Sequence, residues 1–175
     1  LWRYRVNDST WTWISGSETH FASGVYGEKG VSNPFNVPGA RRGAVGWYDS
    51  LNKELWLFGG FGVSAGYGAY LCDILNKEKQ TLKSHLIGNL NDLWVYRLND
   101  STWTWMGGTN ELNHVGVYGE KDIASVDNIP PSRLYSPAWY DSSTRTAWLF
   151  GGGVSINGYI GTHTTNRLHL LHQTH

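Results

Sequence analysis

The residues best suited to bind a ligand occur in pairs that lie 92 positions apart. Arg41 and Arg133 follow "PGA" and "PPS", and Tyr26 and Tyr118 lie in two "GVYGEK" segments. Arginine can form charge-assisted, bidentate hydrogen bonds to carboxylates. A repeated arginine can equally well bond to neighbouring backbone carbonyls, and both interpretations stay open. For the paired tyrosines, packing of the loop against its scaffold is favoured, because one ligand site seldom needs the same residue in every repeat.

Other chemically useful residues give weaker signals. Tyr67 and Tyr159, together with Tyr26 and Tyr118, would suit stacking on sugar rings if they are exposed. His169, His172 and His175 are three apart, a spacing that alternates faces on a strand and cannot present three metal ligands together. Cys72 is the only cysteine, so the chain holds neither an internal disulfide nor a cysteine-based zinc site. No nucleophile elbow, phosphate loop or HExxH motif occurs, and we predict no catalytic residue, metal site or cofactor.

Composition narrows the fold and the partners. The 175 residues include ten Trp, ten Tyr and 22 Gly, which favours short strands joined by tight turns. Lys plus Arg equals Asp plus Glu, so the net charge is zero and nucleic acid is not an expected partner. No apolar run is long enough to span a membrane. No signal peptide is visible, but the chain begins at Leu1, so its compartment stays open.

The pairs belong to a much longer repeat. "NDSTWTW" occurs at 7–13 and again at 99–105, and the same offset aligns "GVYGEK", "WYDS" and "WLFGG". The register never slips over some sixty residues, which predicts a structural repeat. Residues 43–48, 54–60, 92–98 and 102–107 should form one antiparallel sheet in sequential order, with turns at "DSLNK" and "NDST".

These strands carry large apolar residues at nearly every position, so both faces of the sheet must be covered. An antiparallel four-stranded sheet covered by copies of itself is a propeller blade. We therefore expect an all-β propeller fragment, with aromatic side chains buried between blades. The side chains predicted to be buried there are Tyr4, Trp11, Phe58, Tyr96 and Trp103.

The motifs resemble the kelch repeat. Its double glycine, its tyrosine and its tryptophan, with six residues between the last two, match Gly59-Gly60, Tyr96 and Trp103. The fuller pattern is similar to long-blade kelch proteins related in fold to galactose oxidase. One departure is "NRLHLLH" at 166–172, which aligns with "NDLWVYR" and puts Leu171 in place of the motif tyrosine. The resemblance implies a partial kelch β-propeller over 1–175: the end of one blade (1–14), a complete blade (40–107) and a truncated blade (132–175).

The resemblance also implies a function. Kelch proteins bind partners through the loops between strands 2 and 3 and between blades, which here are roughly 14–42, 61–91, 106–133 and 153–167. We expect a scaffold that binds a protein partner. The alternative is the propeller of a secreted, carbohydrate-active or galactose oxidase-like enzyme. Because Cys72 lies in an extra loop, a copper site of that kind cannot be carried over.

That extra loop breaks the repeat. It contains residues 71–88, in which Leu75, Leu82 and Leu86 form a helical stripe and Asp73 could cap the helix. The competing interpretations are a disordered insertion and a translated intron.

Overall fold

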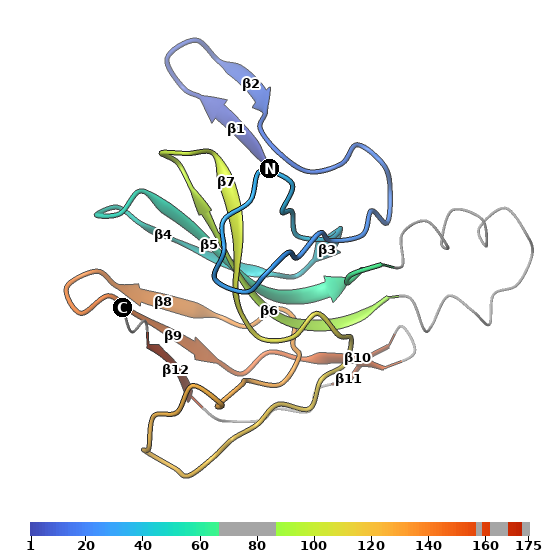
Figure 1. The fold of residues 1–175 in the computed structure, drawn as a ribbon, viewed down its shortest axis with the longest axis vertical. Coiled ribbons are helices and arrows are strands. Elements are labelled where there is room, and N and C mark those ends of the chain that lie inside the picture. The colour runs from blue at the N-terminus through green and yellow to red at the C-terminus, as the bar shows by residue number, and fades with distance from the viewer. Residues whose placement is uncertain (67–86, 157–158, 162–167, 173–175) are drawn as a thin grey trace, which may run out of the picture.

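A computed structural model describes residues 1–66, 87–156, 159–161 and 168–172, all of them in strands, turns and loops (Figure 1). The expected all-β class is confirmed. No helix occurs among these residues, so none of them forms a helix long and apolar enough to cross a membrane. The predicted element at 71–88 falls outside the described residues except at its end, where Gly88 begins a strand.

The central sheet has the predicted strand order. It consists of β4 (Val45–Asp49), β5 (Glu54–Gly62), β6 (Gly88–Arg97) and β7 (Thr102–Gly107), each antiparallel to the next. The short strand β3 (Arg41–Arg42) pairs with the last residues of β5. The prediction of one sequential antiparallel sheet is confirmed, with β5 and β6 each extending beyond the predicted bounds.

Three smaller sheets accompany the central one. They are β1 (Trp2–Arg5) with β2 (Thr10–Trp13), then β8 (Ala138–Asp141) with β9 (Thr146–Phe150) and β12 (Leu168–His172), and β10 (Val154–Ile156) with β11 (Tyr159–Gly161). In Figure 1 the hairpin turns β1–β2, β4–β5, β6–β7 and β8–β9 all lie on one side of the molecule, at the left of the view.

The sequence repeat is also a repeat of strand register. Trp47 pairs with Trp56 in β4–β5, and Trp139 pairs with Trp148 in β8–β9. In the same way the pair Tyr96 and Trp103 in β6–β7 matches the pair Tyr4 and Trp11 in β1–β2. Equal sequence at the offset of 92 therefore gives equal cross-strand pairs.

Aspartates fix the short hairpin turns. Asp8 accepts hydrogen bonds from the backbone and hydroxyl of Thr10, and Asp100 does the same for Thr102. The residue between them, Ser9 or Ser101, has a positive φ of 55° or 58°. Side-chain bonds of this kind offset the cost of the left-handed conformation. The turn predicted at "NDST" is confirmed.

Burial agrees with the prediction in the central sheet and differs from it in the first hairpin. Phe58, Tyr96 and Trp103 are buried, at 2%, 2% and 7% exposure. The prediction was wrong for Tyr4 and Trp11, which are 44% and 65% exposed. Their rings pack on one another, with centroids 5.0 Å apart, but β1–β2 pairs with no further strand among the described residues. A two-stranded ribbon cannot cover its own aromatic face.

The double glycine lies where two sheets meet. The Gly60 amide donates to the carbonyl of Arg133 at 2.8 Å, and a Cβ at Gly60 would lie 2.8 Å from the Arg42 carbonyl oxygen. Gly60 also has a φ of +100°, a conformation in which side chains are strained. Glycine at position 60 therefore lets the segment after β3 approach β5. Glycine at position 59, where a Cβ would lie 2.7 Å from the carbonyl oxygen of Arg133, lets the segment that leads to β8 approach the central sheet.

Candidate functional site

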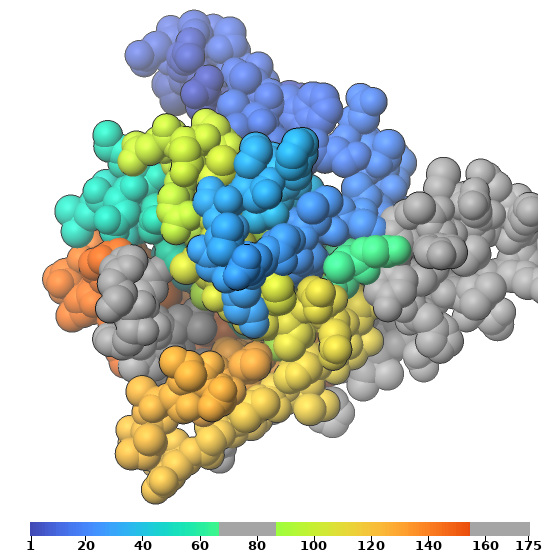
Figure 2. All heavy atoms as spheres, in the orientation of Figure 1, coloured from blue at the N-terminus to red at the C-terminus, as the bar shows by residue number. Residues whose placement is uncertain are grey.

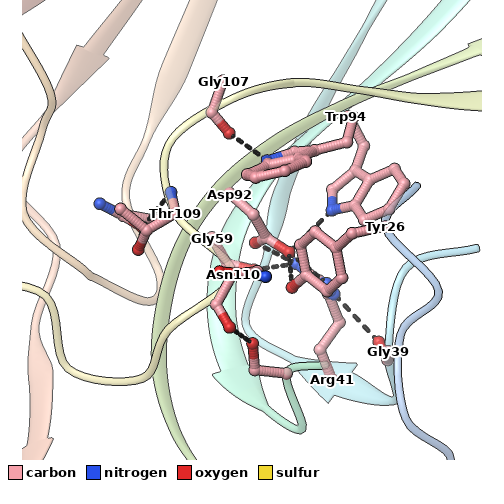
Figure 3. A network of polar contacts seen from close by, with 12 residues as sticks. Tyr26, Gly39, Arg41, Gly59, Asp92, Trp94, Gly107, Thr109 and Asn110 are labelled. Carbon is pink, nitrogen blue, oxygen red and sulfur yellow. Dashed lines mark hydrogen bonds and ion pairs between the residues drawn. The ribbon is translucent and has the colours of Figure 1, made fainter. Parts of the chain in front are cut away.

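The predicted binding residue Arg41 lies at the centre of a buried polar network (Figure 3). Its Nη1 and Nη2 atoms donate to the two carboxylate oxygens of Asp92 at 2.6 and 2.7 Å. Nε donates to the carbonyl of Gly39 at 3.1 Å, and Nη1 also donates to that of Gly59 at 3.0 Å. The Arg41 side chain is 7% exposed and that of Asp92 is fully buried.

Two aromatic residues complete the network around Asp92. The Tyr26 hydroxyl donates to Asp92 Oδ2 at 2.6 Å, and the Trp94 indole Nε1 donates to the same oxygen at 2.7 Å. The ring of Tyr26 packs against Trp94 and Trp105, at centroid distances of 4.8 and 5.1 Å. Asp92 thus accepts four short hydrogen bonds, which satisfies a carboxylate that water does not reach.

The electrostatics follow from this packing. Burial on its own lowers the pKa of Arg41, but the charge and hydrogen bonds of Asp92 outweigh it and hold that pKa above its ordinary value. Burial raises the pKa of the Tyr26 hydroxyl, and the neighbouring Asp92 raises it further. Arg41 therefore stays charged and the phenol of Tyr26 stays neutral at neutral pH.

The loop that carries Tyr26 is held against the central sheet. The Gly30 amide donates to the carbonyl of Trp105 at 2.7 Å, and Lys29 Nζ donates to that of Gly108 at 2.9 Å. Figure 2 shows this blue segment lying against the yellow-green strand β7. Tyr26 is 4% exposed, so it packs as the loop staple and offers no ring face to a sugar.

Arg133 repeats the position of Arg41 with one difference. Nε donates to the carbonyl of Pro131 at 3.1 Å and Nη1 to that of Gly151 at 2.8 Å, the counterparts of Gly39 and Gly59. Arg133 is 3% exposed, and a side-chain hydrogen bond joins it to Tyr118, the counterpart of Tyr26. Both arginines thus bond to carbonyls, as one of the two interpretations of the sequence expected, and their side-chain partners differ.

The other predicted binding residues are more scattered. Tyr118, the counterpart of Tyr26, is 36% exposed. Tyr159 belongs to β11, for which the backbone alone is described, and Tyr67 lies outside the described residues. His169 and His172 are both in β12. No group of three His, Cys, Asp or Glu in the described part of the chain could hold a metal ion.

Sequence reasoning missed Asp92, the acceptor at the centre of the network. The available signal was an acidic residue in "NDLWVY", directly before the large apolar and aromatic residues 93–96. A lone charge in a buried strand requires a partner. Arg41, a repeated cation that comes just before the same sheet, was a candidate for that partner.

No family model matches the chain, and no curated protein matches it either.

Proposed function

We propose that the chain is part of a kelch-type β-propeller and that it works as a scaffold for binding a protein partner. The observation that carries the proposal is the repeated register, in which equal cross-strand pairs recur at an offset of 92. In this proposal residues 40–107 are the complete blade. A propeller is the architecture in which such sheets cover one another.

The binding surface we propose is the loop face, defined by residues 14–40 and 106–133. These two segments are long, whereas the hairpin turns β1–β2, β4–β5, β6–β7 and β8–β9 are short and repeated. Long loops on a rigid scaffold commonly carry binding residues. The loop face also exposes large apolar side chains, namely Phe21, Val25, Val31, Phe35, Val115, Val117, Tyr118, Ile123 and Val126. Exposed apolar surface of this extent is typical of interaction sites.

Matched surface substitutions test the proposal. Phe35 and Val126 on the loop face are 79% and 93% exposed, and Val6 and Leu51 in the hairpin turns are 79% and 70% exposed. Changing either pair to serine should alter stability by at most about 0.5 kcal/mol. The full-length protein would be isolated from its native source with its partners, and the amount of each partner measured by quantitative mass spectrometry.

We expect Phe35→Ser/Val126→Ser to lose the partner and Val6→Ser/Leu51→Ser to keep it. Retention by the first pair together with loss by the second would contradict the proposed face. A recovered partner that consists of glycan alone would favour the carbohydrate-active alternative instead.

A further inference from the structure

Three residues near the junction of the central sheet and the β8–β9 hairpin depart from the repeat. At the offset of 92, each of them stands where the other copy has a residue of a different kind. A structural repeat preserves the residues that its own packing requires, so exposed residues that depart from it are candidates for binding. The three residues and their counterparts are Arg42 and Leu134, Phe61 and Gly153, and Tyr135 and Gly43.

Arg42 presents a cation that has no acidic partner among the described residues. Its counterpart Leu134 is 1% exposed and forms a bridge with Gly153. Arg42 is exposed instead, and its guanidinium lies over the ring of Phe61, 5.1 Å from the ring centroid. No ion pair in the described part of the chain includes Arg42. Contact with a ring face orients a guanidinium and leaves the N–H donors at its edge available to a ligand.

Tyr135 has a left-handed backbone conformation, with a φ of +55°. A bulky side chain is strained in this conformation and is seldom found there. Gly43, its counterpart, has a φ of +64° and adopts it without strain. The Tyr135 side chain lies against Gly43, where a Cβ would be 2.9 Å from the ring, and yet the residue remains 57% exposed. Strained residues are concentrated at functional sites, and here the strained residue holds an aromatic ring in the open.

Arg42 and Tyr135 lie on the same side of the central sheet. Neighbouring strand residues point to opposite faces, so Arg42 points away from the face on which Arg41 forms its buried network. The β8–β9 hairpin packs on this second face, where Arg145 Nε lies 3.9 Å from the carboxylate of Asp49. Tyr135 belongs to the segment that leads into that hairpin. The exposed cation and the exposed ring are therefore placed at one junction.

From these observations we infer that Arg42 and Tyr135 form a binding site for a small acid whose carboxylate is attached to a ring. The carboxylate accepts two charge-assisted hydrogen bonds from the Arg42 guanidinium, and the ring stacks on the exposed face of Tyr135. An ion pair that water reaches contributes little by itself, so a carboxylate without a ring is held less well. The inference goes beyond the proposed function, because this site needs no protein partner.

The ring could belong to an aromatic acid or to an acidic sugar, and a titration distinguishes the two. The ¹⁵N-labelled chain would be titrated with sodium benzoate at neutral pH and constant ionic strength. The backbone amide signals of Gly43 and Tyr135 and the Nε–Hε signal of Arg42 would be followed by NMR. Benzamide, which has the ring without the charge, and sodium acetate, which has the charge without the ring, are the control ligands. Sodium glucuronate forms the second arm.

We expect saturable shifts of these signals with benzoate, with a dissociation constant on the order of millimolar. Acetate should bind about threefold to tenfold more weakly, which is the effect of losing one stacked ring. Glucuronate binding at least as tight as that of benzoate assigns the site to acidic sugars, and weaker binding assigns it to aromatic acids. Absence of saturable shifts with both benzoate and glucuronate overturns the inference. Benzamide or acetate binding as tightly as these two acids overturns it as well.

Three variants complete the test. Tyr135→Gly introduces the residue that the repeat has at this position and removes the backbone strain, so the fold should survive. It should reduce benzoate binding to the level of acetate. Arg42→Gln should weaken benzoate binding at least about tenfold, the effect of losing hydrogen bonds to a charged group. Arg3→Gln removes an exposed arginine from β1 and should leave binding unchanged. Equal weakening by Arg42→Gln and Arg3→Gln would refute the site. No partner takes part in the titration, so its outcome is separate from that of the loop-face substitutions.

Discussion

The buried pair of Arg41 and Asp92 should show strong energetic coupling. Each single substitution leaves the other charge buried without a counter-charge. Arg41→Met leaves a buried carboxylate that still accepts hydrogen bonds from Tyr26 and Trp94, and Asp92→Asn leaves a guanidinium that is 7% exposed. Removing one member of a buried ion pair typically costs about 3–5 kcal/mol. We expect each single variant to lose free energy of unfolding in this range.

The double variant Arg41→Met/Asp92→Asn should be more stable than either single variant. It contains no buried charge, and the amide carbonyl introduced at position 92 can still accept from Tyr26 and Trp94 at the distances that Asp92 Oδ2 now has, 2.6 and 2.7 Å. The loss that remains is the anchoring of Arg41 to the carbonyls of Gly39 and Gly59. Hydrogen bonds of this kind contribute about 1–2 kcal/mol in total, so we expect a loss of about that size.

The free energy of unfolding of the wild type, the two single variants and the double variant can be measured by urea unfolding. Tryptophan fluorescence follows the transition, since the chain contains ten Trp. Arg5→Met is the control, because Arg5 pairs with Asp8 at 3.0 Å while their side chains are 55% and 43% exposed. Such a surface pair contributes at most about 1 kcal/mol. If the double variant lost the sum of the two single losses, the pair would be uncoupled and the reasoning from burial would be refuted.

Three further predictions use pairs of sites within the chain. Trp103→Ala should lower the free energy of unfolding by about 3–5 kcal/mol, and Trp11→Ala by less than about 1 kcal/mol. The reason is that the Trp103 side chain is 7% exposed and that of Trp11 is 65% exposed. Equal losses for the two variants in urea unfolding would contradict this prediction. Gly60→Ala should lower the free energy of unfolding by about 1–3 kcal/mol more than Gly30→Ala. Both glycines have a positive φ, but no described atom lies within 4 Å of a Cβ placed at Gly30. Equal urea midpoints for the two variants would contradict this prediction. Burial would raise the pKa of Asp49, but hydrogen bonds from Asn52 and Tyr140 outweigh it and lower that pKa below its ordinary 3.8. Its contribution to stability is therefore complete above that value and is lost as pH falls below about 4, and Asp49→Asn should flatten this part of the stability–pH curve.

The strands of the central sheet could be predicted because two independent signals agreed. Aromatic and branched runs gave the strands, and the repeat gave their register, since "WYDS" and "WLFGG" recur at one offset. The turns followed from Asp8 and Asp100, whose side chains bond locally to Thr10 and Thr102. Interactions between residues that are close in the sequence can be predicted from the sequence itself.

Burial of the first hairpin could not be predicted in the same way. Tyr4 and Trp11 have the same sequence context as Tyr96 and Trp103, and they form the same cross-strand pair. Their exposure differs because Trp103 is covered by residues far away in the sequence, among them Ser15, whose hydroxyl accepts from the indole at 3.1 Å. A motif specifies which face is apolar, and tertiary neighbours decide whether that face is covered.

The two copies of the network share the carbonyl anchors of the arginine and differ in its side-chain partner, which is Asp92 for Arg41 and Tyr118 for Arg133. Repetition preserved what the backbone requires, so Arg133 keeps its bonds to Pro131 and Gly151 just as Arg41 keeps those to Gly39 and Gly59. The charge partner of Arg41 is different in kind, because Asp92 lies on another strand, 51 positions away in the sequence. The contacts to the backbone therefore follow from residues that the repeat preserves, whereas the ion pair depends on which strand is packed beside the arginine.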